Sequence, residues 1–119
     1  EMIIGIKIDN QFGPVIIIGS GGIYTELIND SVTLLLPLTG TVILKAINKL
    51  KISKLLKGYR GKPKGDIHDL IKTILKIAKF AEKNASRLIE VDINPLIVRA
   101  EGKGVIAGDA LIHYLEDIE

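Results

Sequence analysis

Apolar residues recur at every second position in the first third of the chain, and this period predicts β-strands. Residues 3–8 read Ile-Ile-Gly-Ile-Lys-Ile, and a short, fully apolar run follows the Phe-Gly-Pro turn at residues 12–14. Glycine and Asn-Asp turns separate the runs, which is typical of antiparallel hairpins. The predicted strands are residues 3–8, 15–18, 23–28 and 32–36.

The hydrophobic pattern then changes to helical spacing. Apolar residues three and four positions apart follow Thr39, which we predict to be an N-cap. A second helix is predicted to begin after Asp66, with Asp69 in its first turn and lysines on its outer face. Its predicted buried face consists of Ile67, Leu70, Ile71, Ile74, Ala78 and Ala81.

Two more strands are predicted near the end of the sequence, at residues 88–98 and 105–114, joined by a turn at residues 101–104. The predicted order is therefore four strands, two helices and two strands. Strands and helices grouped in this way predict an α+β fold, with a mostly antiparallel sheet and two main helices packed on one face.

Length and composition limit the possible classes of protein. The chain has 119 residues, enough for one domain, and its lack of cysteine excludes disulfides and thiolate metal sites. It contains neither an apolar run of ~20 residues nor a secretory signal, so we expect a cytoplasmic protein and no membrane partner. The sequence starts at Glu1, inside a strand-like run and without an initiator Met, and we therefore expect a fragment of a longer chain.

Positive charge is concentrated between residues 31 and 65, where there is no acidic residue. The basic residues either solvate a helix surface or attract the phosphates of a nucleotide, CoA or phosphorylated intermediate. Arg60 lies in a glycine-flanked loop and suits two-pronged phosphate recognition, and it is the predicted catalytic residue. Aromatic residues make up only 4% of the chain and no nucleic-acid-binding motif is present, so no nucleic-acid partner is expected. The basic residues are Lys45, Lys49, Lys51, Lys54, Lys57, Arg60, Lys62 and Lys64.

Oxygen-bearing side chains follow one face of the predicted strand 88–98. Because strand side chains alternate, Glu90, Asp92 and Asn94 point the same way. A turn centred near Gly102 would pair residue 105 with residue 99, and would bring Asp109 opposite about Pro95 and within about one residue of Asn94. Carboxylate and carbonyl oxygens are the ligands that Mg²⁺ takes. The face is therefore either a magnesium site or the water-facing side of an edge hairpin. Pro95 cannot donate to the ladder, and a bulge is expected there.

Several motifs in one order resemble the ATP-grasp domains of ADP-forming acyl-CoA synthetases. They are Glu-Met-Ile-Ile-Gly-Ile-Lys-Ile-Asp at residues 1–9, Gln-Phe-Gly-Pro at 11–14, the glycine loop 19–22 followed by Glu26, Leu-Leu-Lys-Gly-Tyr-Arg-Gly at 55–61, and Asp-Ile-Asn-Pro-Leu at 92–96 with Asp109 fifteen residues after Asn94. The chain looks closest to the β-subunit type of ADP-forming acetate–CoA ligase. It is more distantly similar to the succinyl-CoA synthetase β subunit.

This resemblance implies a set of site residues. Asn94 and Asp109 match positions that hold Mg²⁺, and Glu1 matches a glutamate that contacts the nucleotide, ATP or ADP. Asp92 replaces a glutamate of the distant relatives, so it either ligates the metal or supports a ligand. Glu26 is expected to face the site.

The resemblance also implies partners and a reaction. The partners are the N-terminal ATP-grasp lobe, which would precede Glu1, and a CoA-binding subunit or domain. The reaction converts acyl-CoA, phosphate and ADP into acid, CoA and ATP through a phosphohistidine. Neither His68 nor His113 lies in a glycine-rich loop suited to carry phosphate, so both are expected to be structural or exposed. We expect the chain to be inactive alone, with its uncovered sheet face favouring self-association.

Two alternatives remain open at the level of the sequence. The first is a non-catalytic regulatory or binding module that keeps the ATP-grasp fold. The second is a part of a synthetase-like protein acetyltransferase.

Overall fold

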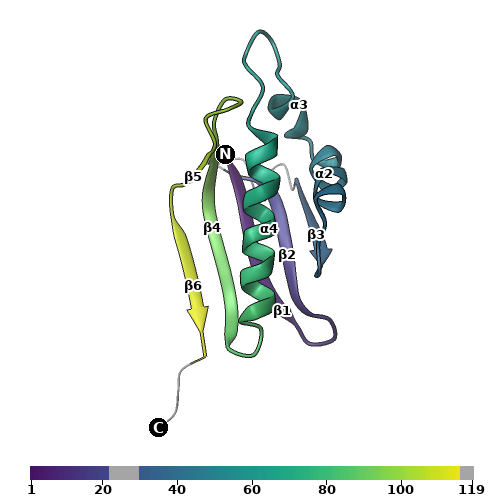
Figure 1. The fold of residues 1–119 in the computed structure, drawn as a ribbon, viewed down its shortest axis with the longest axis vertical. Helices are drawn as coiled ribbons and strands as arrows, with labels where there is room; N and C mark the ends of the chain where they lie inside the picture. The colour runs from purple at the N-terminus through teal and green to yellow at the C-terminus, as the bar shows by residue number, and fades with distance from the viewer. Residues whose placement is uncertain (22–29, 116–119) are drawn as a thin grey trace.

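The computed structural model describes residues 1–21 and 30–115 and contains one antiparallel sheet with helices on one side (Figure 1). The strand predicted at residues 23–28 lies outside the described residues, as does Glu26. The described elements are β1 (Met2–Asp9), β2 (Gly13–Ser20), β3 (Ser31–Leu35), α2 (Gly40–Lys49), α3 (Ser53–Leu56), α4 (Ile67–Lys83), β4 (Leu88–Val98), β5 (Val105–Ala107) and β6 (Ala110–Tyr114).

The sheet has the strand order β3-β2-β1-β4-β5, and β6 also pairs with β4. β5 and β6 therefore follow one another along the same edge of β4, where the prediction had one continuous strand at residues 105–114. In Figure 1 α4 crosses in front of the sheet, and α2 and α3 lie beside it over the β3 side. The α+β fold, with its mostly antiparallel sheet and helices on one face, is confirmed.

The core lies between the sheet and the helices. β1 contributes Met2, Ile4 and Ile6, and α4 contributes Leu70 and Ile74, all fully buried. The predicted buried face of α4 is confirmed, and its four lysines are exposed. Because even-numbered residues of β1 face the helices, its odd-numbered residues lie on the opposite side of the sheet, which we call the open face.

Local sequence explains where the helices begin. The Thr39 hydroxyl accepts a hydrogen bond from the Val42 N–H at 3.2 Å, so the predicted N-cap of α2 is confirmed. Asp66 caps α4 by accepting from the Asp69 N–H at 3.1 Å. Sequence analysis missed α3, which has four residues and no apolar period of its own. No helix of the described residues is long and apolar enough to cross a membrane.

Candidate magnesium and nucleotide site

Asn94 of β4 lies directly opposite Asp109, which is one of the two residues between β5 and β6. Leu96 pairs with Ala107 and Ile93 pairs with Ala110, which places residue 109 opposite residue 94. The Asn94 N–H donates to the Asp109 carbonyl at 3.1 Å. In a regular antiparallel ladder opposite residues project from the same side of the sheet, so this register predicts that the two side chains share one face.

The predicted register was wrong by one residue. We expected Val105 opposite Arg99 and Asp109 opposite about Pro95, whereas Val105 pairs with Val98. The hairpin turn includes Gly102 and Gly104, both with positive φ angles (86° and 80°), and it closes one residue earlier than a turn centred near Gly102 would. The shift brings Asp109 onto Asn94 itself, closer than predicted.

A bulge at Asn94 and Pro95 keeps the Asn94 side chain on the open face. Met2 pairs with Leu96 but Ile4 pairs with Ile93, so β4 contains one extra residue at this point. The predicted bulge is confirmed. It lets Leu96 face the core, where it is 2% exposed, while Asn94 is exposed on the other side.

Gly108 makes room for this arrangement. A Cβ atom on Gly108 would lie 3.1 Å from Cγ and 3.2 Å from Cδ of Pro95, closer than most side-chain contacts. Its N–H donates to the Pro95 carbonyl at 2.8 Å. The Pro95 ring therefore approaches the backbone of Gly108 closely.

Glu90, Asp92 and Asn94 all line one hollow of about 420 Å³ on the open face. The other lining residues include Ile3, Gly5 and Lys7 of β1, whose alternation places them on the same side. The predicted common face of the three β4 side chains is confirmed. At its far end His113 Nδ1 lies 3.8 Å from Glu90 Oε1, and both His113 and His68 are exposed, as predicted.

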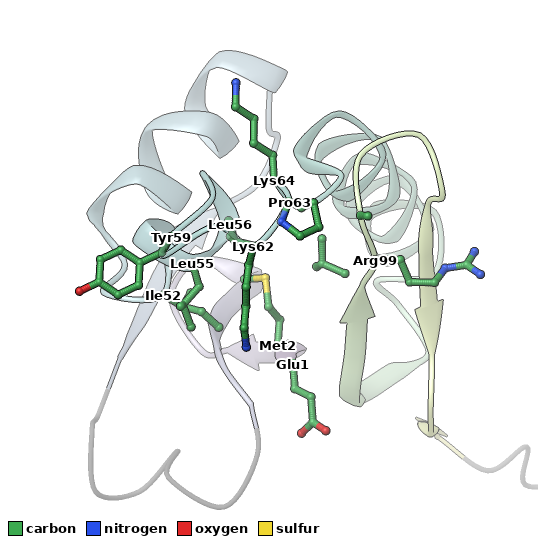
Figure 2. Close-up of a pocket in the computed structure, with 13 residues that line it drawn as sticks. Glu1, Met2, Ile52, Leu55, Leu56, Tyr59, Lys62, Pro63, Lys64 and Arg99 are labelled. Carbon is green, nitrogen blue, oxygen red and sulfur yellow. The ribbon is translucent and has the colours of Figure 1, made fainter.

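Glu1 begins the neighbouring strand beside the same part of the sheet. It precedes Met2, which pairs with Leu96, so strand spacing places the backbone of Glu1 about 10 Å from that of Asn94. Glu1 also borders a pocket of about 300 Å³ on the helical side, between α3, the segment from Lys62 to Gly65, and the end of β4. In Figure 2 Lys62 extends toward Met2 and Glu1, whereas Lys64 and Arg99 point away from the pocket.

The oxygen donors of Asn94 and Asp109 suit Mg²⁺, which needs few protein ligands, better than they suit a metal ion whose ligands all come from the protein. Within residues 1–21 and 30–115 there is no cluster of three or more His, Asp or Glu side chains that could hold an ion. Asn94 supplies an amide oxygen and Asp109 a carboxylate, whose Oδ1 is oriented by the Ala110 N–H at 2.9 Å. Mg²⁺ commonly binds one or two protein groups and completes its octahedron with water and phosphate oxygens. The residues present fit such an ion.

Arg60 lies apart from this group of residues. It belongs to the loop between α3 and α4, which both pack on the helical side, and it does not line the hollow of the open face. Its φ angle is 52°, and its guanidinium carbon lies 5.2 Å from the centre of the Tyr59 ring. The catalytic role of Arg60 stays a prediction.

Two aspartates have structural contacts that sequence analysis did not find. Asp30 accepts from the Ser20 hydroxyl and from the backbone N–H groups of Lys51 and Ile52. Asp66, predicted only as a cap, also accepts from Gly102 and Gly104, more than 30 residues away in sequence. The one sequence signal for either role is an aspartate beside a turn, and it does not indicate the distant partner.

Comparison with known proteins identifies the family of this chain. Residues 1–113 match the family model of the ATP-grasp domain. The match includes almost the whole chain and carries the proposed metal pair. The chain therefore belongs to the ATP-grasp family.

Similar proteins include larger ADP-forming ligases. The ADP-forming acetate–CoA ligase of Methanocaldococcus jannaschii is 38% identical over 112 residues, which are 94% of this chain and 16% of that ligase. The β subunit of ADP-forming acetate–CoA ligase II of Pyrococcus furiosus is 35% identical over 94% of this chain and 48% of the subunit. The chain thus spans less than half of either relative.

A solved structure has the same fold. The dinucleotide-forming acetyl-coenzyme A synthetase 1 of Candidatus Korarchaeum cryptofilum, in complex with coenzyme A and Mg-AMPPCP, superimposes with a TM-score of 0.89 at 33% identity. The match covers 98% of this chain and 53% of that chain. The resemblance found in the sequence motifs is confirmed by these comparisons.

Proposed function

We propose that residues 1–119 form the magnesium- and nucleotide-binding lobe of an ADP-forming acyl-CoA synthetase. The observation that carries this proposal is the position of Asn94 directly opposite Asp109 in the last hairpin of a chain that matches the ATP-grasp domain. The complete enzyme would convert acyl-CoA, phosphate and ADP into acid, CoA and ATP through a phosphohistidine. Such an enzyme would work in the cytoplasm, where nucleotides and CoA are available.

Asn94 and Asp109 would hold the ion, and Asp92 would border it from the hollow. When bound, Mg²⁺ neutralises the charge of the nucleotide phosphates and holds them in line for transfer. Glu1 lies about 10 Å from Asn94 by strand spacing. A nucleotide with its phosphates at Asn94 and Asp109 could therefore extend along the sheet toward Glu1.

The contribution of this chain to phosphoryl transfer is positioning. It would offer two metal ligands and the hollow beside them. The proposed second lobe would cover the nucleotide from the other side and exclude water. For this reason we expect residues 1–119 to bind Mg-ADP weakly when they are isolated. A CoA-binding subunit or domain would supply the phosphohistidine.

The test uses the full-length protein that contains this lobe. ATP formation from acetyl-CoA, phosphate, ADP and Mg²⁺ is measured for the wild type and for Asp109→Ala. Loss of a metal ligand should lower turnover about a hundredfold, because a bound ion contributes several kcal/mol to the transition state. Asp9→Ala, at the far end of the sheet, is the matched control and should retain activity.

The alternatives give different results. A regulatory module would bind Mg-ADP without forming ATP from any acyl-CoA tested. A protein acetyltransferase would transfer the acetyl group to a lysine of a protein and would not need phosphate. Full ATP formation by Asp109→Ala would refute the assignment of the metal pair.

A further inference from the structure

The tip of the β4–β5 hairpin is fastened to the first turn of α4 by two aspartates. Asp66 Oδ2 accepts hydrogen bonds from the N–H groups of Gly102 at 3.1 Å and Gly104 at 2.8 Å. Asp69 Oδ2 accepts from the Val105 N–H at 2.9 Å. Hydrogen bonds to an ionised acceptor are stronger than neutral ones, so these three contacts hold the tip firmly.

Backbone contacts strengthen the same attachment. The Asp66 N–H donates to the Arg99 carbonyl at 2.8 Å, and the Glu101 N–H donates to the Lys64 carbonyl at 2.9 Å. Asp66 itself is only 7% exposed. The N–H groups of Asp69 and Gly104 hold the pKa of the Asp66 carboxyl below its usual value, so Asp66 is ionised at neutral pH.

The backbone conformation of Gly104 and its lack of a side chain allow the contact between Asp69 and the hairpin tip. Its φ angle is 80°, and a Cβ atom on it would lie 3.0 Å from Asp69 Oδ2. A side chain at position 104 would therefore be strained in its backbone and would also push Asp69 away from Val105. The carboxylate and the glycine together fix where β5 starts.

The start of β5 sets the position of Asp109. Val105 pairs with Val98, and the ladder continues through Ala107 opposite Leu96. Asp109 then follows two residues after Ala107 and lies opposite Asn94. A shift of one residue would turn the Asp109 side chain toward the other face of the sheet, because side chains alternate.

β5 is a short edge strand of the described sheet, and its Val105 also packs against the hydrophobic core. It has three residues, and β4 is the strand with which it pairs. The ladder is interrupted at Gly108 and Asp109 before β6 begins, and β4 is bulged at the same level. At this level β4 holds the chain through the bonds from the Gly108 N–H to the Pro95 carbonyl and from the Asn94 N–H to the Asp109 carbonyl. Asp109 is thus approached by the β6 ladder from one side and by β5, with its aspartate attachment, from the other.

We infer that Asp66 and Asp69 are positioning residues for the magnesium site, acting through the register of β5, although neither lies on the open face. This inference rests on the proposed function of Asn94 and Asp109. Asp69 is the better residue to test, because Asp66 also caps α4 and its loss would disturb the helix.

The experiment measures Mn²⁺ binding in the presence of ADP by electron paramagnetic resonance, with the full-length protein. Asp69→Ala should weaken Mn²⁺ binding about tenfold, the lower end of the effect of removing a group that supports metal ligands. Asp69→Asn keeps an acceptor oxygen for the Val105 N–H and should recover most of the affinity. Melting temperatures are recorded for every variant.

Asp9→Ala is the matched control. Asp9 Oδ1 accepts from the N–H groups of Gln11 at 2.8 Å and Phe12 at 3.0 Å, so it also holds a hairpin turn, but at the other end of β1. Its loss should leave the Mn²⁺ affinity unchanged even if the melting temperature falls. The inference is overturned if Asp69→Ala binds Mn²⁺ as the wild type does, or if Asp9→Ala weakens binding equally.

Asp109→Ala separates this inference from the proposed function. If it abolishes Mn²⁺ binding while Asp69→Ala has no effect, the metal assignment holds and only the positioning role is wrong. If Asp109→Ala binds Mn²⁺ normally, the metal assignment fails, and the positioning inference fails with it.

Discussion

Replacing Asp30 by alanine removes a carboxylate that joins three separate parts of the fold. Its oxygens accept from the Ser20 hydroxyl at 2.6 Å, the Lys51 N–H at 2.7 Å and the Ile52 N–H at 2.9 Å. These bonds link the end of β2 to the segment between α2 and α3. Asp30 is 7% exposed, so water cannot fully replace the lost acceptor.

The size of the effect follows from these contacts. A hydrogen bond to a charged group contributes about 1.5–3 kcal/mol. Three such bonds are lost, but water can reach the exposed residue Lys51 and satisfy part of the loss. We therefore expect Asp30→Ala to lower the free energy of unfolding by about 3 kcal/mol, and Asp30→Asn by about half as much.

Acidic pH should reduce the contribution of the Asp30 carboxylate to the free energy of unfolding. Burial by itself raises the pKa of Asp30, but the Ser20 hydroxyl and the N–H groups of Lys51 and Ile52 outweigh it and hold the pKa below the usual 3.8. A carboxyl whose pKa is lower in the folded state stabilises the fold above its unfolded pKa, and loses this effect as the pH falls through the folded pKa. The stability difference between wild type and Asp30→Asn should thus narrow below about pH 4.

Urea denaturation at several pH values measures both effects. Asp9→Ala, which removes two hydrogen bonds from an exposed turn, serves as the comparison and should cost about 1 kcal/mol or less. The reasoning is refuted if Asp30→Ala costs no more than Asp9→Ala. It is also refuted if the difference between wild type and Asp30→Asn stays constant down to pH 3.

Three further substitutions test the packing of the core, the close approach of Gly108 to Pro95 and the loop that contains Arg60. Ile74→Ala, at a fully buried position of α4, should lower the free energy of unfolding by about 2–5 kcal/mol in urea, and a loss below 1 kcal/mol would contradict the packing described. Gly108→Val should push against the Pro95 ring, cost about 1–3 kcal/mol and weaken Mn²⁺ binding beside Asp109; unchanged binding would show that the close approach is not needed. Arg60→Lys should lower turnover of the full-length enzyme while changing its stability by about 0.5 kcal/mol or less, and unchanged turnover would leave Arg60 as a surface residue.

Long elements with a clear period could be predicted from the sequence. α4 has apolar residues at helical spacing over 17 residues and an aspartate cap, and both features are local. β4 alternates over most of its 11 residues, which gave the common face of Glu90, Asp92 and Asn94. α3 has only four residues, too few for a period to emerge.

The features that could not be predicted depend on contacts between distant residues. The register of the hairpin differs by one residue because Asp66 and Asp69 bind its tip, and nothing within residues 99–105 reveals these partners. The split between β5 and β6 has a local cause, because Pro95 offers no N–H to the ladder opposite Gly108. The nearness of Asn94 and Asp109 was predictable because both residues lie on one hairpin.

The measurement that tests the central claim most directly is a crystal structure of the full-length protein with Mn²⁺ and a non-hydrolysable nucleotide, located by the anomalous scattering of the metal. We predict a metal peak on the open face within about 2.2 Å of an oxygen of Asn94 and of Asp109, bridged to phosphate oxygens. A nucleotide-bound metal held by other residues, with Asn94 and Asp109 out of its reach, would contradict the account.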